Sequence, residues 1–486
     1  MSGAVFETSL GRVAGVAAGG VVHVPRLRYA LPPTGARRFA LPEPVTARED
    51  ISGARTPGPV PLQLPSRLAK VMGSYPAAPD EDCLHLDIWV PEGASGAPVF
   101  VFLHGGAYMT GGGSLPCYEG AALAARTGMV VVNVSYRLGV MGFLPLPGLA
   151  PANLGLHDQV AALRFIRREI GAFGGNAANI TLAGQSAGGF SIAALLSMGE
   201  AAARPLFDRA VLLSAPMGMS LQGPEAREAP AAAFLDALGL APGDRAGLEA
   251  VSAEALMAAQ GAVLRARSAA ADDVTPPFMP VIDGTLITRD PVAALLGGAA
   301  AWCPVIAGTT REEHAAFYYG DAAVAAAAPE LLARRLEEAW PGDAGALARL
   351  RARRPGADAL ALLIDVTSEL RFQRGTRAFL EAQVAAGGAA WAYSFDWQSP
   401  DPGIAACHCI ELPFLFANTD TWAEAPMLRG AERAGLDGLA TAFGDALAGF
   451  ARTGTPQDGT PLAWPGYGPG GAVMHFDRFT SCSAAA

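Results

Sequence analysis

A serine flanked by two glycines stands where an apolar run gives way to a helical pattern. The stretch TLAGQSAGGF, residues 181–190, contains Gly184, Ser186 and Gly188 in the order Gly-x-Ser-x-Gly. A sharp strand-to-helix turn needs residues without side chains, and it lifts the serine Oγ out of the sheet. The start of the following helix presents free N–H groups and a positive dipole end. This context predicts a nucleophilic serine, whereas a structural turn serine is the alternative in a chain with 58 glycines.

A second glycine-rich segment could stabilise the negative charge that such a serine creates. FLHGGAY places Gly105, Gly106 and Ala107 directly after another strand pattern. Backbone N–H groups fixed there would stabilise the oxyanion of acyl transfer, and each donor typically lowers the barrier by about 3–4 kcal/mol. The predicted donors are the N–H groups of Gly106, Ala107 and Ala187. A plain loop is the alternative interpretation.

A serine hydroxyl needs a general base, and the chain has only seven histidines. In hydrolases with this kind of serine turn, the serine comes first in the chain, then the acid, then the histidine. His314, His408 and His475 are therefore the candidates. His408 is preferred because it lies in ACHCIELPFLF, a loop after the strand pattern AAWAYSFDW, from which an imidazole could reach back over the sheet. A hydrogen-bonded loop histidine is the alternative.

The acid that orients this histidine should follow an earlier strand. PVIAGTTREEH supplies such a strand end, with Glu312 and Glu313 side by side. Position alone does not distinguish between these two glutamates. Asp283, Asp365 and Asp401 are weaker candidates by position.

The elements that would position these residues alternate between strand and helix patterns. Strands are predicted within APVFVFLHGG, MVVVNVSYRL, ITLAGQS, RAVLLSAP, PVIAGTT and AAWAYSFDW, most of them apolar on both faces. Helical spacing fills LHDQVAALRFIRREIGAF and ELRFQRGTRAFLEAQVAAG. EDCLHLDIWVP alternates, which predicts a strand with one buried face. The order predicts an α/β protein with a mostly parallel central sheet and helices on both faces.

The chain of 486 residues is predicted to form a single domain, because large α/β enzymes often exceed the usual domain size. Residues 222–300 and 322–385 are rich in alanine and carry few strand signals. We expect them to be mainly helical excursions over the active-site end of the sheet. Proline-rich stretches at 41–65 and 399–403 are expected to be surface loops.

Composition limits the class of protein and of partner. Apolar residues make up 51% of the chain and charged residues 16%, so a large core is expected. A formal net charge of −10 argues against a nucleic-acid partner. No stretch reaches the roughly 18 uninterrupted apolar residues of a membrane span, and the first residues lack a signal-peptide pattern. Cys407 and Cys409 bracket His408, but no second ligand cluster has suitable spacing, so no metal site is expected. We expect a cytoplasmic protein; its oligomeric state is not indicated.

Nine ordered segments resemble the type-B carboxylesterase family of the α/β-hydrolase superfamily, in the style of bacterial para-nitrobenzyl-esterase-like carboxylesterases. They run almost from end to end: YALPPTGARRF, EDCLHLDIWVP, HGGAY, VSYRLGVMGFL, NLGLHDQVAALRFI, FGGNAANITLAGQSAGG, LLSAP, AGTTREEH and HCIELPF. The resemblance implies the α/β-hydrolase fold. It also implies a serine carboxylic-ester hydrolase that works through an acyl-enzyme, with no metal or organic cofactor and with a small-molecule ester as its partner.

The resemblance assigns roles that the residues alone leave open. The family's Gly-x-x-x-Asp-Glu motif matches residues 308–313, so its catalytic glutamate falls on Glu313. The family's histidine falls on His408, which gives a triad of Ser186, Glu313 and His408 expected within hydrogen-bonding reach. Ser214 in LLSAP matches a serine expected beside the triad. Two further pairs match buried structural salt bridges: Arg38 with Glu81, and Arg137 with Asp158.

Three departures from the family pattern narrow the expected substrate. No cysteine precedes Cys83, so a disulfide of secreted members is missing, which favours a reducing compartment. Gly73 stands where cholinesterase-like members carry a tryptophan that stacks on quaternary ammonium, with Tyr75 the nearest aromatic residue. Gln185 replaces the glutamate that precedes the nucleophile in those members. These features argue against choline esters and predict neutral, apolar esters.

Two alternatives to an esterase stay open. The same triad could hydrolyse amides or carbamates, and a non-catalytic binding protein on a hydrolase scaffold is a further alternative, although such proteins typically lack a triad member. The acyl and alcohol sizes are not indicated. Seven aromatic residues could line an apolar pocket, although each is more often part of a core: Tyr108, Phe317, Tyr318, Tyr319, Trp397, Phe414 and Phe416.

Overall fold

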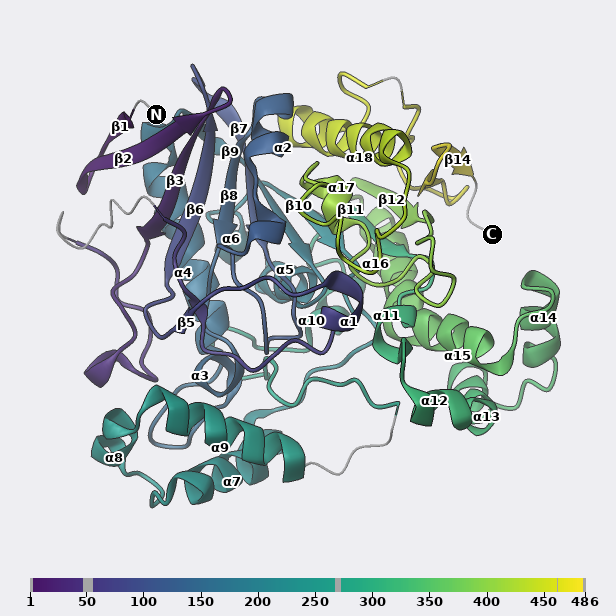
Figure 1. Ribbon diagram of the computed structural model, residues 1–486, viewed down its shortest axis with the longest axis horizontal. Coiled ribbons are helices and arrows are strands. Elements are labelled where there is room, and N and C mark those ends of the chain that lie inside the picture. The colour runs from purple at the N-terminus through teal and green to yellow at the C-terminus, as the bar shows by residue number, and fades with distance from the viewer. Residues whose placement is uncertain (1–2, 47–55, 267–271, 461, 484–486) are drawn as a thin grey trace.

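A twelve-stranded sheet runs through the computed structural model, which describes residues 3–46, 56–266, 272–460 and 462–483 (Figure 1). Its strand order is β1-β2-β3-β6-β8-β7-β9-β10-β11-β12-β13-β14. The central pairs from β8 to β13 are parallel, and the outer pairs are antiparallel. The central strands are β7 (Ala97–Leu103), β8 (Val130–Val134), β9 (Gly175–Gln185), β10 (Arg209–Leu213), β11 (Val305–Thr310), β12 (Ala390–Phe395) and β13 (Val473–Phe476). The outer strands are β1 (Gly3–Thr8), β2 (Gly11–Ala18), β3 (Val21–Arg28), β6 (His85–Pro91) and β14 (Ser481–Ser483).

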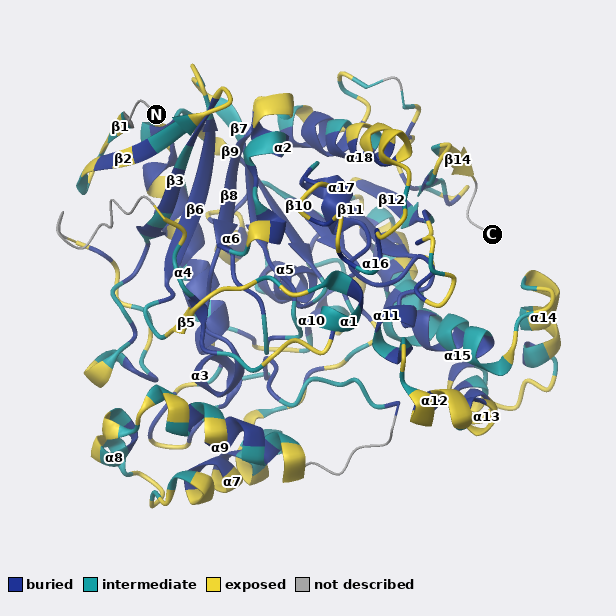
Figure 2. Ribbon diagram, in the orientation of Figure 1, coloured by how far each residue is buried: buried dark blue, intermediate teal, exposed yellow. Residues whose placement is uncertain are grey.

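Helices cover both faces of this sheet, which confirms the predicted α/β class. Alternate residues of β7 point to opposite faces: Val99 and Val101 belong to one core, Phe100 and Phe102 to the other. Figure 2 shows the buried sheet between the two helix layers. One layer contains α4 (Leu154–Glu169), α5 (Ala187–Ser197), α10 (Pro291–Leu296) and α16 (Arg374–Ala385); the other contains α2 (Ala121–Thr127), α17 (Leu412–Leu415) and α18 (Arg433–Thr453).

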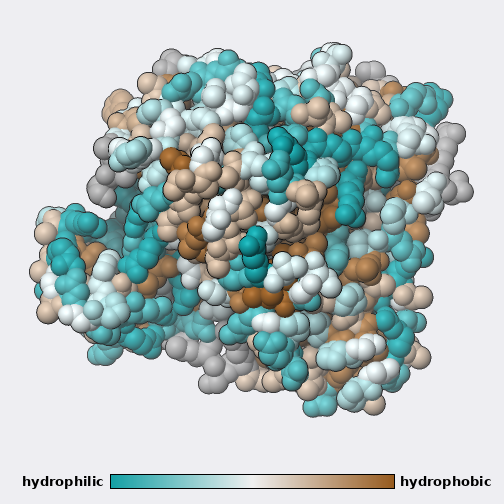
Figure 3. Space-filling model, turned by 180° about the vertical axis from the view of Figure 1, so that it is seen from behind, coloured by the Kyte–Doolittle hydropathy of each residue, from teal (hydrophilic) through white to brown (hydrophobic). Residues whose placement is uncertain are grey.

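Two groups of helices lie away from the sheet, one at the lower left of Figure 1 and the other at its right-hand side. Seen from behind in Figure 3, the second group, within residues 322–368, forms a lobe that stands out from the body, with a hollow beside it. Within the stretches 222–300 and 322–385, α10 and α16 instead pack against α5 and β12. The first group is α7 (Glu228–Leu238), α8 (Arg245–Ala250) and α9 (Ala253–Ala266); the second is α12 (Ala322–Ala326), α13 (Ala328–Ala339), α14 (Ala346–Arg353) and α15 (Ala359–Ser368). The short helices are α1 (Ala69–Met72), α3 (Gly139–Phe143), α6 (Glu200–Ala203) and α11 (Ala315–Tyr318).

Two local predictions are wrong. Strand β6 is buried on both faces, because His85 lies under the 58–59 backbone and Trp89 stacks with His23. The stretch 41–65 is not only surface loop: β4 (Val60–Pro61) pairs with β5 (Pro79–Asp80) and is buried. Residues 47–55 of that stretch lie outside the described residues.

Both predicted buried salt bridges are confirmed. The guanidinium of Arg38 donates to both carboxylate oxygens of Glu81, at 2.6 Å each. Arg137 donates from Nε and Nη2 to Asp158 at 2.8 and 2.6 Å, with both side chains almost fully buried. Removing one partner of such a pair would leave an uncompensated charge in the core. None of the helices in the described part of the chain has the length and apolarity of a membrane span.

Candidate active site

Ser186 occupies the turn between β9 and α5. Its backbone is in a rare conformation for a residue with a side chain, with φ 56° and ψ −119°. The turn is tight: a Cβ added to Gly188 would lie 2.0 Å from the Leu103 carbonyl oxygen of β7. The Ser186 N–H donates to the Leu213 carbonyl at 2.8 Å, which fixes the turn to the neighbouring strand β10. The serine side chain borders a cavity beyond the carboxyl end of β9.

His408 lines the same cavity, and Glu313 contacts its imidazole. Glu313 follows β11, and His408 lies in the loop between β12 and α17. The imidazole Nδ1 is 2.5 Å from Glu313 Oε2, and both side chains are buried. The other carboxylate oxygen accepts a hydrogen bond from the Thr310 N–H at 2.9 Å. A carboxylate that accepts from Nδ1 leaves Nε2 unprotonated and able to take a proton.

Ser186 and His408 line the same cavity but are not hydrogen bonded. Within the described residues, Ser186 Oγ makes no hydrogen bond, and His408 Nε2 lies 3.3 Å from Gln185 Nε2. The predicted contact between Ser186 and His408 is therefore absent, whereas the predicted contact between His408 and Glu313 is present. Catalytic hydrogen bonds often shorten only when substrate is bound.

The three residues predicted to supply N–H donors, Gly106, Ala107 and Ala187, line this cavity together with Ser186. Gly106 and Ala107 have positive φ values, 109° and 56°, and neither donates a hydrogen bond within the described residues. Ala187 is the first residue of α5, where an N–H has no acceptor within the helix. The Tyr108 carbonyl accepts from the Gly139 N–H at 2.7 Å, which holds the loop in place. Three free donors around one point can stabilise a negatively charged oxygen.

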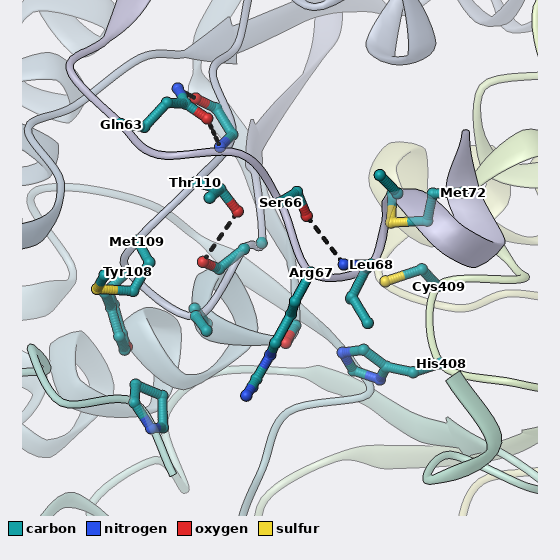
Figure 4. Close-up of a pocket in the computed structure, with 18 of the residues that line it drawn as sticks. Gln63, Ser66, Arg67, Leu68, Met72, Tyr108, Met109, Thr110, His408 and Cys409 are labelled. Carbon is teal, nitrogen blue, oxygen red and sulfur yellow. Dashed lines mark hydrogen bonds between the residues drawn. The ribbon is translucent and has the colours of Figure 1, made fainter. Parts of the chain in front are cut away.

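The cavity has a volume of about 610 Å³ and mostly apolar walls (Figure 4). Of the seven aromatic residues singled out from the sequence, Tyr108 and Phe317 line it. Gly73 and Tyr75 line it as well. Phe372 was missed because no motif marks it; its ring lies 5.1 Å from that of His408. The other five do not line it: Tyr318, Tyr319, Trp397, Phe414 and Phe416.

A sequence model of the carboxylesterase family matches residues 2–481. The chain belongs to the carboxylesterase family. It is 36% identical over 476 residues to the para-nitrobenzyl esterase of Bacillus subtilis, covering 96% of this chain and 93% of that protein. It is 34% identical over 445 residues to a probable N-octanoylanthranilate hydrolase of Rhodococcus erythropolis, covering 90% and 91%.

Solved structures agree with this assignment. A carboxylesterase from Geobacillus stearothermophilus superposes with a TM-score of 0.85 at 34% identity, covering 99% of this chain and 97% of that chain. A structure of a PNB esterase gives the same TM-score, identity and coverage. The predicted α/β-hydrolase fold and the predicted resemblance are thereby confirmed. The protein is a serine enzyme that hydrolyses carboxylic esters.

The other candidate histidines of this carboxylesterase have different surroundings. His314 borders the cavity, but neither ring nitrogen has a partner within the described residues. His475 lies in β13, next to the edge strand β14 and away from the cavity, with Nδ1 2.6 Å from Asp396 and Nε2 2.6 Å from Ser483 Oγ. Glu312 binds Arg311 and the Ala406 N–H rather than a histidine. The remaining acid candidates also have other partners: Asp283 with Asn153, Asp365 with Arg354, and Asp401 with Tyr319. The described residues contain no group of three or more His, Cys, Asp or Glu that could hold a metal ion.

Glu411 is a buried acid near Glu313 and His408 that sequence reasoning missed, although it lies in the segment HCIELPF. Its Oε1 accepts a hydrogen bond from Ser214 Oγ at 3.2 Å, and its Oε2 has no partner within the described residues. Burial and, to a smaller extent, the negative charge of Glu313 raise the pKa of Glu411 to about 7. Ser214 thus contacts this second acid rather than Ser186 or His408.

A Glu411→Gln variant should change the pH dependence of stability. The pKa of Glu411 in the folded state is raised above its ordinary value of 4.5. The contribution of Glu411 to stability is therefore fully present below pH 4.5. It is lost as the pH rises towards about 7. The variant has no charge at this site, so it should gain stability relative to the unchanged protein between pH 5 and 8, on the order of 2–3 kcal/mol. Denaturant unfolding across that range measures the gain.

The control is Glu424→Gln at an exposed position. Its stability difference from the unchanged protein should stay constant with pH. A difference for Glu411→Gln that is equally constant would show that this carboxyl does not titrate in that range.

Proposed function

We propose that Ser186, His408 and Glu313 form the catalytic triad of this esterase. His408 takes the proton of Ser186 as its Oγ attacks the ester carbonyl, and then gives that proton to the leaving alcohol. Water cleaves the acyl-enzyme by the same steps with roles reversed. Glu313 orients the imidazole and balances its transient positive charge. No step requires a metal or an organic cofactor.

We propose further that the N–H groups of Gly106, Ala107 and Ala187 bind the oxyanion of both tetrahedral intermediates. The single observation that carries the proposed mechanism is the 2.5 Å contact between Glu313 and His408, because His408 lines the same cavity as Ser186 and the residues of these three donors. Replacing Ser186 by alanine tests the proposal, because hydrolysis of a 4-nitrophenyl ester should then fall to the level that binding and the donors alone support.

The substrate is proposed to have an apolar acyl or alcohol group. Most of the cavity wall is apolar, and burial of each CH₂ group contributes about 0.8 kcal/mol to binding. The cytoplasm is the proposed location, because the chain has no cysteine before Cys83 to form the disulfide found in secreted members of the family.

Hydrolysis of amides is a second candidate function. One relative, 34% identical, is named as a probable N-octanoylanthranilate hydrolase, and an N-octanoyl group is bound through an amide. The proposed triad can attack an amide carbonyl by the same steps. Comparing kcat/KM for an aryl ester and the matching anilide distinguishes the two functions.

Gly106→Ala should lower kcat by roughly 10²–10³-fold, with a smaller change in KM. The added Cβ would lie 2.0 Å from the Thr110 carbonyl oxygen, at a φ of 109° that side chains rarely adopt. The loop must move, and the two donors at 106 and 107 move with it. Steady-state kinetics with a short aryl ester measures the loss.

Gly171→Ala is the matched control, because an added Cβ there meets nothing within 4 Å. It should leave kcat within about twofold of the unchanged protein. A folded Gly106→Ala variant with undiminished kcat would exclude the proposed oxyanion site.

A further inference from the structure

The charged side chains on the cavity wall are cationic. Arg67 and Arg371 line the cavity, and among the described residues that line it there is no Asp or Glu. The whole chain has 45 acidic and 35 basic residues, so acidic residues would be expected there if charge were distributed at random. This wall therefore differs in charge from the rest of an acidic protein.

Arg371 comes from an unusual backbone segment. It lies in η6 (Glu369–Gln373), a π-helical turn between α15 and α16. Such turns redirect side chains and are frequent at functional sites. The Arg371 carbonyl accepts a hydrogen bond from the Gly218 N–H at 2.9 Å, which anchors the turn. The next residue is Phe372, whose ring packs on His408, and Arg371, Phe372 and His408 all line the same cavity.

The neighbouring acids do not neutralise Arg371. Glu369, on the same turn, pairs with Arg374 and Arg377. Asp365, one turn earlier, pairs with Arg354. Within the described residues the Arg371 guanidinium has neither a hydrogen bond nor an ion pair. A half-buried guanidinium beside an apolar wall is unfavourable without a partner, so a ligand that supplies an anionic group would be stabilised there.

His314 adds a neutral hydrogen-bonding group to the same wall. It is fully buried and lines the cavity, and both ring nitrogens lack partners within the described residues. Burial lowers the pKa of His314 well below its ordinary value, and the neighbouring His408 and Arg371 side chains lower it further. A neutral imidazole offers one N–H donor and one acceptor. An oxygen atom of a ligand can accept that N–H bond.

Arg67 supplies the second positive charge. It donates to the Val274 carbonyl at 2.8 Å and lies over the Phe317 ring, 5.1 Å from its centre. Figure 4 shows its side chain extending into the cavity from the loop that carries it, on the side where His408 lies. The same Phe317 ring lies 5.2 Å from the rings of both His314 and His408. These groups therefore surround one part of the cavity next to the triad.

We propose that this carboxylesterase prefers esters that carry a carboxylate besides the scissile bond, and that Arg371, supported by Arg67 and His314, selects them. A guanidinium binds a carboxylate through two parallel hydrogen bonds, which fixes the orientation of the substrate as well as its charge. The proposal rests on the proposed function, because it places the substrate at Ser186. It replaces the neutral substrate expected from the sequence with an anionic one whose remaining part is apolar.

The test compares esters that differ only in charge. On the alcohol side, 4-carboxyphenyl butyrate is paired with 4-carbamoylphenyl butyrate. On the acyl side, phenyl hemiglutarate is paired with the phenyl ester of glutaramic acid. For each pair, the measured quantity is the ratio of kcat/KM for the carboxylate to kcat/KM for the carboxamide.

Arg371→Gln should lower this ratio roughly 10- to 100-fold for at least one pair, because it removes a charge-assisted hydrogen bond. The pair that responds assigns the carboxylate to the acyl or the alcohol side. Arg371→Lys, which retains the charge without the planar fork, should recover part of the ratio. Arg377→Gln is the matched control, since Arg377 pairs with Glu369 and does not line the cavity; its ratio should equal that of the unchanged protein.

Raising the ionic strength should lower the ratio of the unchanged protein more than that of Arg371→Gln, which retains the charge of Arg67. Ratios that are the same in the unchanged protein and in Arg371→Gln for both pairs would overturn the inference, as would an equal fall in Arg377→Gln. Those results would leave the proposed function intact as long as the carboxamide esters are hydrolysed. Hydrolysis that survives in Ser186→Ala would instead overturn the proposed function itself.

Discussion

A Ser186→Ala variant is expected to hydrolyse a short aryl ester with a kcat roughly 10⁴- to 10⁶-fold below that of the unchanged protein. Without Oγ no acyl-enzyme can form, so only binding and the three N–H donors still accelerate the reaction. Ser186 Oγ makes no hydrogen bond within the described residues, so its removal breaks no contact of the fold. The thermal midpoint should therefore change little. Kinetics with 4-nitrophenyl butyrate and a thermal melt measure the two quantities.

Ser197→Ala is the matched control. Ser197 ends the same helix, and its Oγ donates to the Ala194 carbonyl at 2.6 Å, away from the cavity. Its kcat should remain near that of the unchanged protein. A Ser186→Ala protein that is folded and still turns over at a near-normal rate would refute the proposed nucleophile.

Covalent labelling separates Ser186 from Ser483, a serine whose hydroxyl lies against a histidine ring. Ser483 Oγ lies 2.6 Å from His475 Nε2, and His475 Nδ1 contacts Asp396. These three residues are therefore also connected as serine, histidine and acid. Ser483 is exposed, and the hydrogen bond to Asp396 raises the pKa of His475, so a smaller fraction of this imidazole is unprotonated and able to take a proton near neutral pH. A fluorophosphonate probe should label the Ser186 peptide of the unchanged protein, and mass spectrometry of Ser186→Ala should find no label at Ser483.

The central sheet could be predicted from the sequence because its strands are apolar on both faces and alternate with periodic helices. The prediction for β6 was wrong because the polar-looking positions His85 and Trp89 are covered by residues distant in the chain, such as His23. Local alternation reports the type of side chain, whereas burial depends on long-range packing.

The candidate triad could be predicted because each member follows a strand of the sheet, so its position along the chain indicates where it lies in the fold. The choice between Glu312 and Glu313 could not be made from position, since both stand on one turn and only the geometry distinguishes their partners. Arg67, His314 and Arg371 were not predicted as a group. They belong to a loop, a helix start and a π-helical turn, and no motif marks residues that meet only at a cavity wall.

Replacing each of the two adjacent glutamates by glutamine is expected to have very different effects. Glu313→Gln should lower kcat about 10³–10⁴-fold. A glutamine amide can donate to His408 Nδ1, which would favour the tautomer with the proton on Nε2. That nitrogen could then no longer accept the proton of Ser186. The amide also carries no charge to balance the imidazolium. Glutamine has nearly the same shape as glutamate. The loss of kcat would therefore come from the changed position of the proton on His408 and from the missing negative charge.

Glu312→Gln is the control for this reasoning. Glu312 accepts from Arg311 Nε at 2.8 Å and from the Ala406 N–H at 3.1 Å, and it does not contact His408. Its substitution should weaken the anchoring of the loop that carries His408, with a lower thermal midpoint and a fall in kcat of less than about tenfold. Kinetics and thermal melts of the two variants, measured side by side, decide the matter. Similar losses of kcat in both, or the larger loss in Glu312→Gln, would mean that the carboxylate at 313 does not set the tautomer of the base.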